Sequence, residues 1–380
     1  MHRLIASAVV LFVSLGSVRA QDGFKPLFNG KDLTGWVNVN CAPSTWFVKD
    51  NMIITTGKPT GYLRTERMYE NFILEFEWFH APQPKGSVGN SGLFVWGDPI
   101  PAMGTGYTRS IEVQVLVNLL YKDKKGNATA TSHGDLFSIW GASCKPDRPH
   151  PGGSQRCLPS ENVCKGEYEW NHYRVTATNG ALKLAVNGKE VSGVTESNPR
   201  KGFLALESEG SECRFKNIQI KELPSTNPKP AEVCDADKGF QCLFTGLDLA
   251  GWKATDQQKA HWKMGDGVLS YNGKGVGQSA RGLWTEKSFA DFELICDFKT
   301  SFGLNLRGDG LVTLAGTNKG WNRAVVRVKG DHFSIMINGK VTIDNMRMAG
   351  LPATGPIALL CRDEPQQFRN VFIRALKAGE

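Results

Sequence analysis

The chain has 380 residues, of which 41% are hydrophobic, and it carries a formal net charge of +8 at pH 7. This length accommodates two domains, each large enough to bury a hydrophobic core of its own. The densest basic cluster, Lys122, Lys124 and Lys125, has no aromatic side chain between its members. Surfaces that bind nucleic acid usually combine a basic stripe with aromatic side chains that stack on the bases, so we expect no nucleic-acid partner.

Residues 1–20 predict a secretory signal peptide. His2 and Arg3 precede a short apolar run from Ile5 to Val13, and Ala20 supplies a small residue suited to cleavage. The run is too short to span a bilayer, and no later stretch is apolar enough to do so. We therefore expect a secreted or periplasmic protein without membrane insertion.

The rest of the chain contains one sequence pattern twice. Residues 32–36 return as 248–252, residues 187–189 as 338–340, and residues 215–218 as 368–371. The first copy is longer, because it runs from Gly92 to Trp170 where the second runs only from Gly303 to Trp321. We expect function in the additional segment, which holds nearly all the reactive-looking side chains.

Most stretches of both copies alternate apolar and polar residues with period two. Asn179-Gly180, Asn187-Gly188 and Asn338-Gly339 separate such runs and are typical of β-hairpin turns. No stretch has a sustained helical repeat with caps. The sequence predicts antiparallel β-sandwiches over residues 21–224 and 238–380, joined by a proline-rich linker over 225–237.

The additional segment is rich in proline and glycine between residues 146 and 159. This favours an ordered irregular loop rather than added strands, folded over one sheet and forming a wall of its cleft. All nine cysteines follow the signal peptide, where an oxidising compartment favours disulfides. The pairs 234–242 and 296–361 are reasonable choices, and at least one internal bond is expected among cysteines 144, 157 and 164, although the sequence does not fix the connectivity. The odd total leaves at least one thiol free or bound to another molecule.

Five blocks of the first copy, residues 27–36, 89–94, 111–115, 169–173 and 215–218, together resemble the 3-keto-disaccharide hydrolase family. The resemblance implies concanavalin A-like (jelly-roll) sandwiches, the second degenerate because it lacks the blocks at 89–94 and 111–115. It also implies a carbohydrate-active enzyme that cleaves glycosidic bonds of sugars oxidised at C3.

The chemistry of such sugars defines what the site needs. A ketone at C3 acidifies the C2 proton, so a base removes it, the C1 substituent leaves by elimination, and water then adds back. The site needs one well-placed base and an electrophilic group to hold the enolate oxygen. The paired carboxylates of an ordinary glycosidase are not required.

Glu112 is the strongest catalytic candidate. Alternation places Ile111, Val113 and Val115 on the core face of a strand and Glu112 with Gln114 on the other face. A sandwich-fold glucanase would present a second carboxylate beside Glu112, so Gln114 there disfavours the two-carboxylate mechanism. The competing interpretation is a solvated strand face.

His133 and Asp135 lie in the additional segment and share one face if that segment is extended. With Glu112 or His150 they would bind a divalent metal or act as a hydrogen-bonded acid–base pair; otherwise they only hold the loop. Either His133 or Glu112 would remove the C2 proton. No cofactor other than such a metal is expected.

Substrate-binding candidates complete the predicted site. Asn90, Ser91 and Gln114 suit sugar hydroxyl groups, and Trp96 either stacks on a pyranose face or belongs to the core. Arg148 or Arg156 would hold the enolate or a sugar-acid carboxylate, unless both are plain surface charges.

The sequence thus predicts a secreted enzyme whose first copy cleaves 3-keto glycosides by C2 deprotonation, elimination and hydration. The second copy is expected to be a packing partner or a sugar-binding module. The alternative is a non-catalytic carbohydrate-binding (lectin-like) or adhesion protein. A third possibility, an ordinary glucanase, requires turnover of unoxidised glucans.

Overall fold

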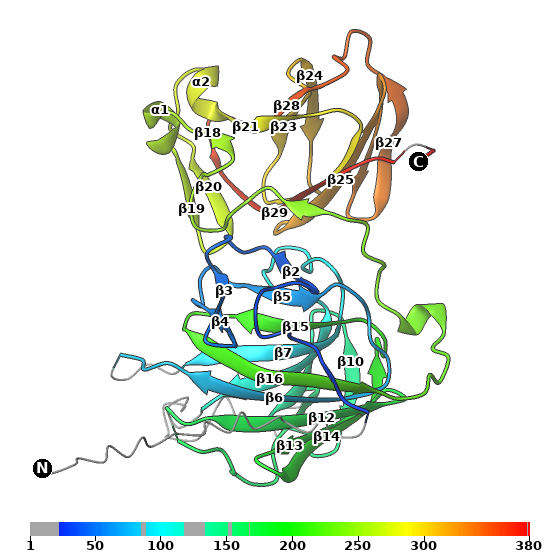
Figure 1. The fold of residues 1–380 in the computed structure, drawn as a ribbon. Coiled ribbons are helices and arrows are strands. Elements are labelled where there is room, and N and C mark those ends of the chain that lie inside the picture. Colours follow the sequence, from blue (N-terminus) through cyan, green and yellow to red (C-terminus); the bar gives the residue numbers. More distant parts are fainter. Residues whose placement is uncertain (1–22, 85–88, 118–133, 151–153, 167, 378) are drawn as a thin grey trace, which may run out of the picture.

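The computed structural model describes residues 23–84, 89–117, 134–150, 154–166, 168–377 and 379–380. Two β-sandwiches are stacked on one another, the first coloured blue to green and the second yellow to red (Figure 1). Helix in the described residues is limited to α1 (Asp256–Lys259), α2 (Gln278–Arg281) and a 3-10 turn, Pro230–Glu232. The predicted all-β fold is confirmed. Neither α-helix of the described chain has the length and apolar character needed to cross a membrane.

The first sandwich consists of a nine-stranded and a seven-stranded antiparallel sheet. The nine-stranded sheet has the order β10 (Ser143–Pro146), β14 (Lys189–Asn198), β13 (Ala181–Val186), β12 (Asn171–Thr178), β6 (Phe72–His80), β16 (Cys213–Glu222), β4 (Met52–Thr55) and β3 (Trp46–Lys49), with β1 (Lys25–Pro26) paired to β16. The seven-stranded sheet has the order β11 (Arg156–Cys157), β9 (Leu136–Ile139), β8 (Ser110–Leu116), β7 (Asn90–Gly97), β15 (Phe203–Ser208), β5 (Gly61–Thr65) and β2 (Trp36–Val39).

The second sandwich repeats this plan with fewer strands. Its eight-stranded sheet has the order β19 (Trp262–Gly265), β20 (Val268–Asn272), β29 (Pro365–Ala375), β22 (Phe292–Phe298), β25 (Asn322–Lys329), β26 (His332–Ile337) and β27 (Lys340–Arg347), with β17 (Gln241–Cys242) paired to β29. Its five-stranded sheet has the order β18 (Trp252–Lys253), β21 (Gly282–Phe289), β28 (Gly355–Leu360), β23 (Phe302–Leu306) and β24 (Gly310–Leu314). Strands β7, β8 and β15 of the first sandwich thus correspond to β23, β24 and β28 of the second.

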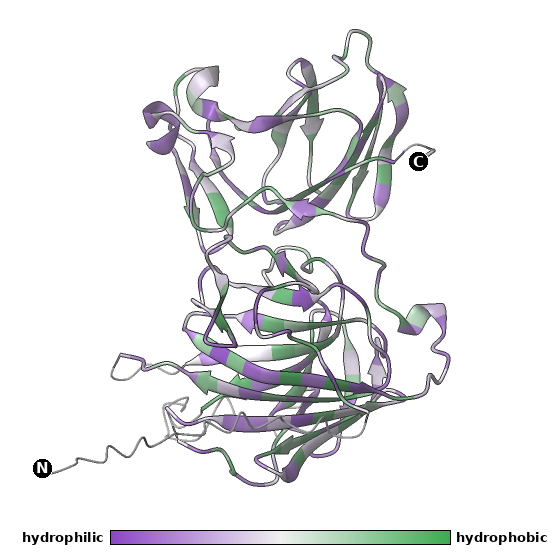
Figure 2. Cartoon of the chain, viewed as in Figure 1, coloured by the Kyte–Doolittle hydropathy of each residue, from purple (hydrophilic) through white to green (hydrophobic). Residues whose placement is uncertain are grey.

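The strands and hairpin turns follow the alternating sequence pattern from which they were predicted. Along β12 buried and half-buried residues alternate, and Figure 2 shows hydrophobic and hydrophilic residues interspersed along the strands. Asn179 and Gly180 have φ values of 50° and 76° and connect β12 to β13 in a two-residue hairpin. Left-handed conformations at both central positions are what such a turn requires, and asparagine and glycine tolerate them best.

The additional segment of the first copy forms strands, which corrects the expectation of an irregular loop. Its described part contains β9, β10 and β11; β9 extends the seven-stranded sheet beside β8, and β10 pairs with β14 of the opposite sheet. Pairing along β8 from Ser110 to Val113 satisfies the backbone polar groups that a strand edge leaves open. His133 and the lysines at 122, 124 and 125 lie outside the described residues.

The disulfide prediction is wrong, because all nine cysteines are free thiols. Several thiols contact backbone carbonyls instead; the Sγ of Cys234 lies 2.9 Å from the oxygen of Trp96, and that of Cys144 lies 3.6 Å from the oxygen of Gln155. Burial raises the pKa of Cys234 well above its usual range. These cysteines therefore pack as small apolar side chains.

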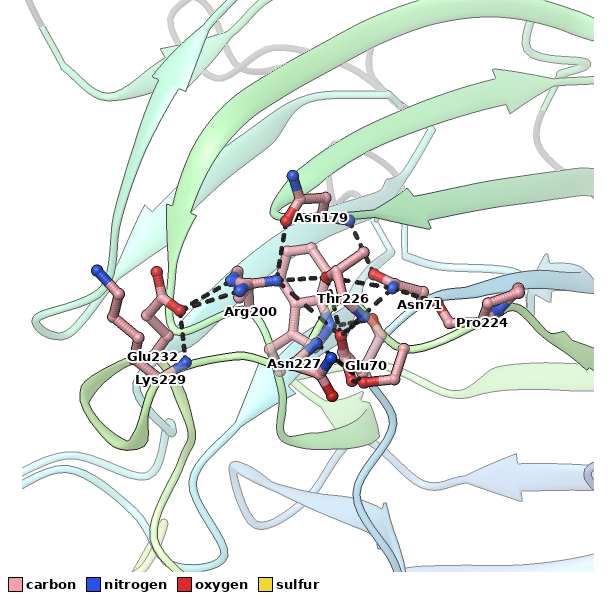
Figure 3. Close-up of polar contacts among 11 residues, drawn as sticks. Glu70, Asn71, Asn179, Arg200, Pro224, Thr226, Asn227, Lys229 and Glu232 are labelled. Atoms are coloured by element: carbon pink, nitrogen blue, oxygen red, sulfur yellow. Dashed lines mark hydrogen bonds and ion pairs between the residues drawn. The ribbon is translucent and has the colours of Figure 1, made fainter.

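The linker between the sandwiches is fixed to the surface of the first one (Figure 3). The backbone N–H of Thr226 donates to Glu70 at 2.7 Å, and Arg200 donates to the Thr226 hydroxyl at 2.6 Å. Arg200 also pairs with Glu232 at 3.0 Å. The chain thus enters the second sandwich from an ordered strap and not from a free tether.

The two sandwiches share a small apolar core of their own. The outer face of the seven-stranded sheet contributes Val39, Tyr62, Phe94 and Ala205, and the outer face of the eight-stranded sheet contributes Ile295 and Phe372. Within the seven-stranded sheet Phe94 is paired directly with Glu112. The second copy therefore covers part of the sheet face on which Glu112 lies.

Candidate functional site

A cavity of about 260 Å³ lies on the outer face of the seven-stranded sheet. Its floor comes from β7 and β8, and its sides come from β9, from the end of β15 and from the loop between β7 and β8. Its lining consists of three carboxyl groups, two amides and four larger side chains: Glu112, Glu207, Glu209, Asn90, Gln114, Tyr107, Phe137, Ile139 and Trp140.

Glu112 and Gln114 lie on one face of β8, as the alternation predicted. Their neighbours Ile111 and Val113 belong to the hydrophobic core between the sheets. Glu112 is only 7% exposed, so the alternative of a solvated strand face is wrong. The Nε2 of Gln114 donates to Asn90 Oδ1 at 2.8 Å, which fixes both amides beside Glu112.

Glu207 and Glu209 are site residues that the sequence interpretation missed. Glu207 is buried at the end of β15, and Glu209 follows it beside Asn90, whose Nδ2 donates to the Glu209 carboxylate. A Cβ added at Gly92 would lie 2.8 Å from Glu207 Oε2 and 2.9 Å from Glu112 Oε1. The absence of a side chain at position 92 therefore lets these two carboxyl groups approach the same point.

Burial of several acids together shifts their proton affinities. Desolvation raises the pKa of Glu112 to about 8, with Glu209 and Asp135 adding repulsion and Arg156 opposing the shift. The pKa of Glu207 is raised well above its usual range, first by burial and then by Glu112 and Glu209. Glu207 Oε2 is buried and has no hydrogen-bond partner among the described residues, so nothing there stabilises a negative charge on Glu207. The cluster therefore retains protons at neutral pH.

Arg156 and Asp135 adjoin this cluster. They form an ion pair in which Asp135 is fully buried, and an Arg156 amino group lies 3.5 Å from Gln114 Oε1. The guanidinium also stacks 4.1 Å from the Phe137 ring centroid. Burial raises the pKa of Asp135 to about 7 against the opposing charge of Arg156. Arg156, from the additional segment, is thus the cation that acts on Glu112.

The described residues do not provide a metal site. Among them no three His, Cys, Asp or Glu side chains are grouped to hold an ion, and one oxygen of the Asp135 carboxylate is paired with Arg156. The predicted partnership of Asp135 with His133 involves a residue outside the described ranges, and it remains a prediction.

An aromatic pair stands at the mouth of the cavity. Tyr107 and Trp140 are stacked, with ring centroids 6.3 Å apart and planes inclined by 11°. The Tyr107 hydroxyl donates to Glu209 Oε1 at 2.8 Å, and Trp140 is 51% exposed. An exposed indole beside polar groups is a typical surface for packing against a sugar ring.

Four predicted binding residues lie elsewhere. Trp96 is fully buried with its indole N–H donating to Glu70, so it is a core residue and cannot stack on a sugar. Ser91 points into the sandwich and donates to the oxygen of Glu207 at 2.8 Å. Arg148 is held by the backbone oxygens of Leu158 and Val191. The described lining of the cavity includes none of Arg148, His150 and Arg156, although Arg156 lies behind it against Gln114 and Phe137, which do line it.

The second copy has lost every acid of this cluster. Strand register places Leu311 of β24 where Glu112 stands in β8, because each is opposite the same position of the neighbouring strand, Asn305 and Phe94 respectively. By the spacing of the repeat, Leu360 replaces Glu207 and Arg362 replaces Glu209. That comparison of the two copies was the sequence signal that would have revealed Glu207 and Glu209.

The fold and site define a tandem β-sandwich protein with one acidic cavity and one copy without it. Residues 23–221, 239–318 and 311–374 match the model of the 3-keto-alpha-glucoside-1,2-lyase-like domain, and the chain belongs to that family. The repeated match confirms that both copies derive from this domain.

Known relatives are similar mainly to half of the chain. A 3-keto-disaccharide hydrolase of Bacteroides thetaiotaomicron is 23% identical over 235 residues, covering 53% of this chain and 79% of that protein. A solved structure from Parabacteroides distasonis, of a proposed glycosyl hydrolase, has 23% identity and a TM-score of 0.40, covering 53% of this chain and 94% of its own. Carbohydrate-binding module CBM66 of Bacillus subtilis has 11% identity and a TM-score of 0.34, covering 50% and 96%. The family and the named relative support glycosyl hydrolase-type activity.

Proposed function

We propose that the first copy cleaves glycosidic bonds of 3-keto sugars and that the protein acts outside the cytoplasm, as its signal-like first twenty residues suggest. The observation that carries the proposal is the buried carboxyl cluster, in which Glu112 has a pKa of about 8. A carboxylate with so high a proton affinity is a far stronger base than an ordinary glutamate.

In the proposed reaction Glu112 removes the proton at C2 and the electron pair passes to the C3 oxygen as an enolate. Arg156 supplies the positive charge that stabilises the enolate, in place of Arg148. The electrons then return to form the C1–C2 double bond as the C1–O bond breaks. Glu207, held neutral by burial, donates its proton to the leaving oxygen. Water adds across the double bond to complete net hydrolysis.

Ordinary glycoside hydrolysis is the competing function, and the structure gives it a specific basis. Glu207 supplies the second carboxyl group that Gln114 does not, and a general acid paired with a carboxylate is the usual equipment of glycosidases. The two mechanisms differ in their substrates, because only the elimination route needs a ketone at C3.

The decisive experiment incubates the protein with a 3-keto glycoside and with its unoxidised parent in heavy water, with and without a chelator. Cleavage of the keto substrate alone, with solvent deuterium at C2 of the product, is expected. Glu112→Gln should abolish turnover while substrate affinity is kept, and Glu190→Gln, on the exposed part of β14, serves as the matched control. Cleavage of the parent compound would establish ordinary hydrolysis, and binding without any turnover would establish a lectin.

A further inference from the structure

One segment of the first copy, the loop of residues 98–109 between β7 and β8, contacts the second copy and also lines the cavity. We call this segment the Tyr107 loop, because Tyr107 is the member that lines the cavity. In the second copy only residues 307–309 connect the equivalent strands β23 and β24. The long loop thus exists only in the copy that has the acidic cluster.

The polar groups at the tip of the loop are bonded to side chains of the second copy. The N–H of Gly104 donates to Asp297 Oδ2 at 2.8 Å, and the Asn370 Nδ2 donates to the oxygen of Thr105 at 2.8 Å and to that of Ala102 at 3.2 Å. Arg323 donates to the oxygen of Pro101 at 2.9 Å.

Those side chains are themselves held in a buried network. Asp297 is fully buried, is paired with Arg323 through distances of 2.7 and 2.9 Å, and accepts from Asn370 at 2.7 Å. A buried carboxylate with several charge-assisted hydrogen bonds has little freedom to move. The network is therefore a rigid receptor for the loop.

The fit at the tip excludes any side chain. A Cβ at Gly104 would lie 2.4 Å from two ring atoms of Trp321, so the glycine backbone lies directly against the indole. Three residues farther along, Tyr107 bonds Glu209 and stacks on Trp140. The second copy also acts on the acidic cluster through charge, since repulsion from Asp266 contributes to the raised pKa of Glu209.

We propose that the degenerate copy is a positioning domain, in which Asn370 and Asp297 hold the Tyr107 loop so that the Tyr107 hydroxyl meets Glu209. The proposal rests on the proposed function of the first copy. It assigns Asn370 and Asp297 as positioning residues that act through Tyr107 and touch no substrate.

The repeat itself supplies an internal control. Asn217 is the counterpart of Asn370, both have φ of 51°, and Asn217 donates to Glu77 at 2.6 Å much as Asn370 donates to Asp297. Asn217 lies exposed on the nine-stranded sheet and makes no bond to the Tyr107 loop. Glycine tolerates this backbone conformation, so Asn370→Gly and Asn217→Gly remove the same side chain at equal backbone cost.

Turnover of a 3-keto glycoside is then compared in the full-length variants. We expect Asn370→Gly to lower kcat about tenfold with little change in KM, the size of effect produced by losing a hydrogen bond to a charged group. Asn217→Gly should match the wild type. Combined with Tyr107→Phe, Asn370→Gly should add almost nothing, because both changes remove the same contact. Equal rates for the two Asn variants, or effects that multiply in the double variant, would overturn the proposal.

A second pair of variants guards against failure of Asn370→Gly to fold. Gly104→Ala forces a methyl group against Trp321, whereas Gly188→Ala has a similar φ, 89° against 75°, and nothing within 4 Å. Gly104→Ala should reproduce the kinetic defect and Gly188→Ala should not. If the wild type fails to cleave any 3-keto glycoside, the proposed function falls, and the inference is decided by hydrogen exchange. Backbone amide hydrogen exchange across residues 98–109 is then expected to be faster in Asn370→Gly than in Asn217→Gly. Equal exchange rates in the two variants would show that the positioning role is wrong as well.

Discussion

Replacing Glu112 by glutamine should stabilise the protein at alkaline pH while it removes activity. The carboxyl group titrates near its ordinary pKa of 4.5 in the unfolded chain but at about 8 in the folded site. Between these values the unfolded chain loses a proton that the folded chain keeps. Stability therefore falls as pH rises through this window, and it levels off above pH 8. Glutamine has no proton to lose and escapes the penalty.

The size of the effect follows from the width of the window. At 1.36 kcal/mol for each pKa unit, a shift from 4.5 to about 8 sets an upper limit of about 5 kcal/mol. Glu207 and Glu209 titrate together with Glu112, so part of this cost is carried by the other two acids. We expect a net gain of about 2–4 kcal/mol for Glu112→Gln at about pH 9, and a gain below about 1 kcal/mol at about pH 5.

The assay is urea unfolding of wild type and Glu112→Gln at both pH values, followed by tryptophan fluorescence. Glu190→Gln, which removes an exposed acid from β14, should leave the free energy of unfolding unchanged relative to wild type at either pH. A gain for Glu112→Gln that is the same at both pH values would refute the reasoning, because a glutamate that titrates normally costs nothing extra in alkali.

Three further changes test the remaining parts of the site. Trp140→Ala should raise KM for a 3-keto glycoside about 3- to 10-fold with kcat nearly unchanged, as expected for a lost aromatic contact. Phe47→Ala, which removes an exposed aromatic side chain from the nine-stranded sheet, should leave KM unchanged. A fall in kcat alone for Trp140→Ala would contradict a stacking role. Gly92→Ala should remove most turnover in a folded protein, because its methyl group would displace Glu207 and Glu112, and normal rates would show that their proximity is unimportant. Arg156→Gln should shift the rising limb of the pH–rate profile to higher pH, since Arg156 lowers the pKa of Glu112, and Arg156→Lys should restore it in part.

The fold was largely predictable because its signals are local. Alternation and Asn-Gly turns depend on neighbouring residues, and the duplication could be checked against itself. The strands of the additional segment were not predicted, since the prolines and glycines that favour a loop begin at Pro146, the last residue of β10, lie on either side of β11 and leave β9 uninterrupted. The disulfides failed for a different reason: cysteine count and compartment say nothing of whether two thiols meet in space.

The site was only partly predictable, because its members come from strands that are distant in sequence. Glu112, Gln114 and Asn90 were found through short blocks on β7 and β8, two strands that are adjacent in both sequence and sheet. Glu207 and Glu209 reach the same face because β15 pairs with β7 from the other side, a register that no local pattern contains. The sequence left Trp96 open between the core and the cleft, because an indole in an alternating strand fits either face, and the structure places it in the core.

The two copies show how an acidic site and its support have separated after duplication. Keeping three acids together in a buried place costs stability, and in the second copy leucine stands at two of the three equivalent positions, Leu311 and Leu360. Freed from that cost, the second copy uses its other sheet: Ile295 and Phe372 cover Phe94, next to Glu112, and Asp297 receives the Tyr107 loop. The carboxyl groups themselves lie in a cavity whose described lining comes from the first copy, and burial there is the first cause of the raised pKa values of Glu112 and Glu207. The described lining thus places the proposed base among residues of the first copy, and the second copy contributes by holding the Tyr107 loop, whose hydroxyl group donates to Glu209.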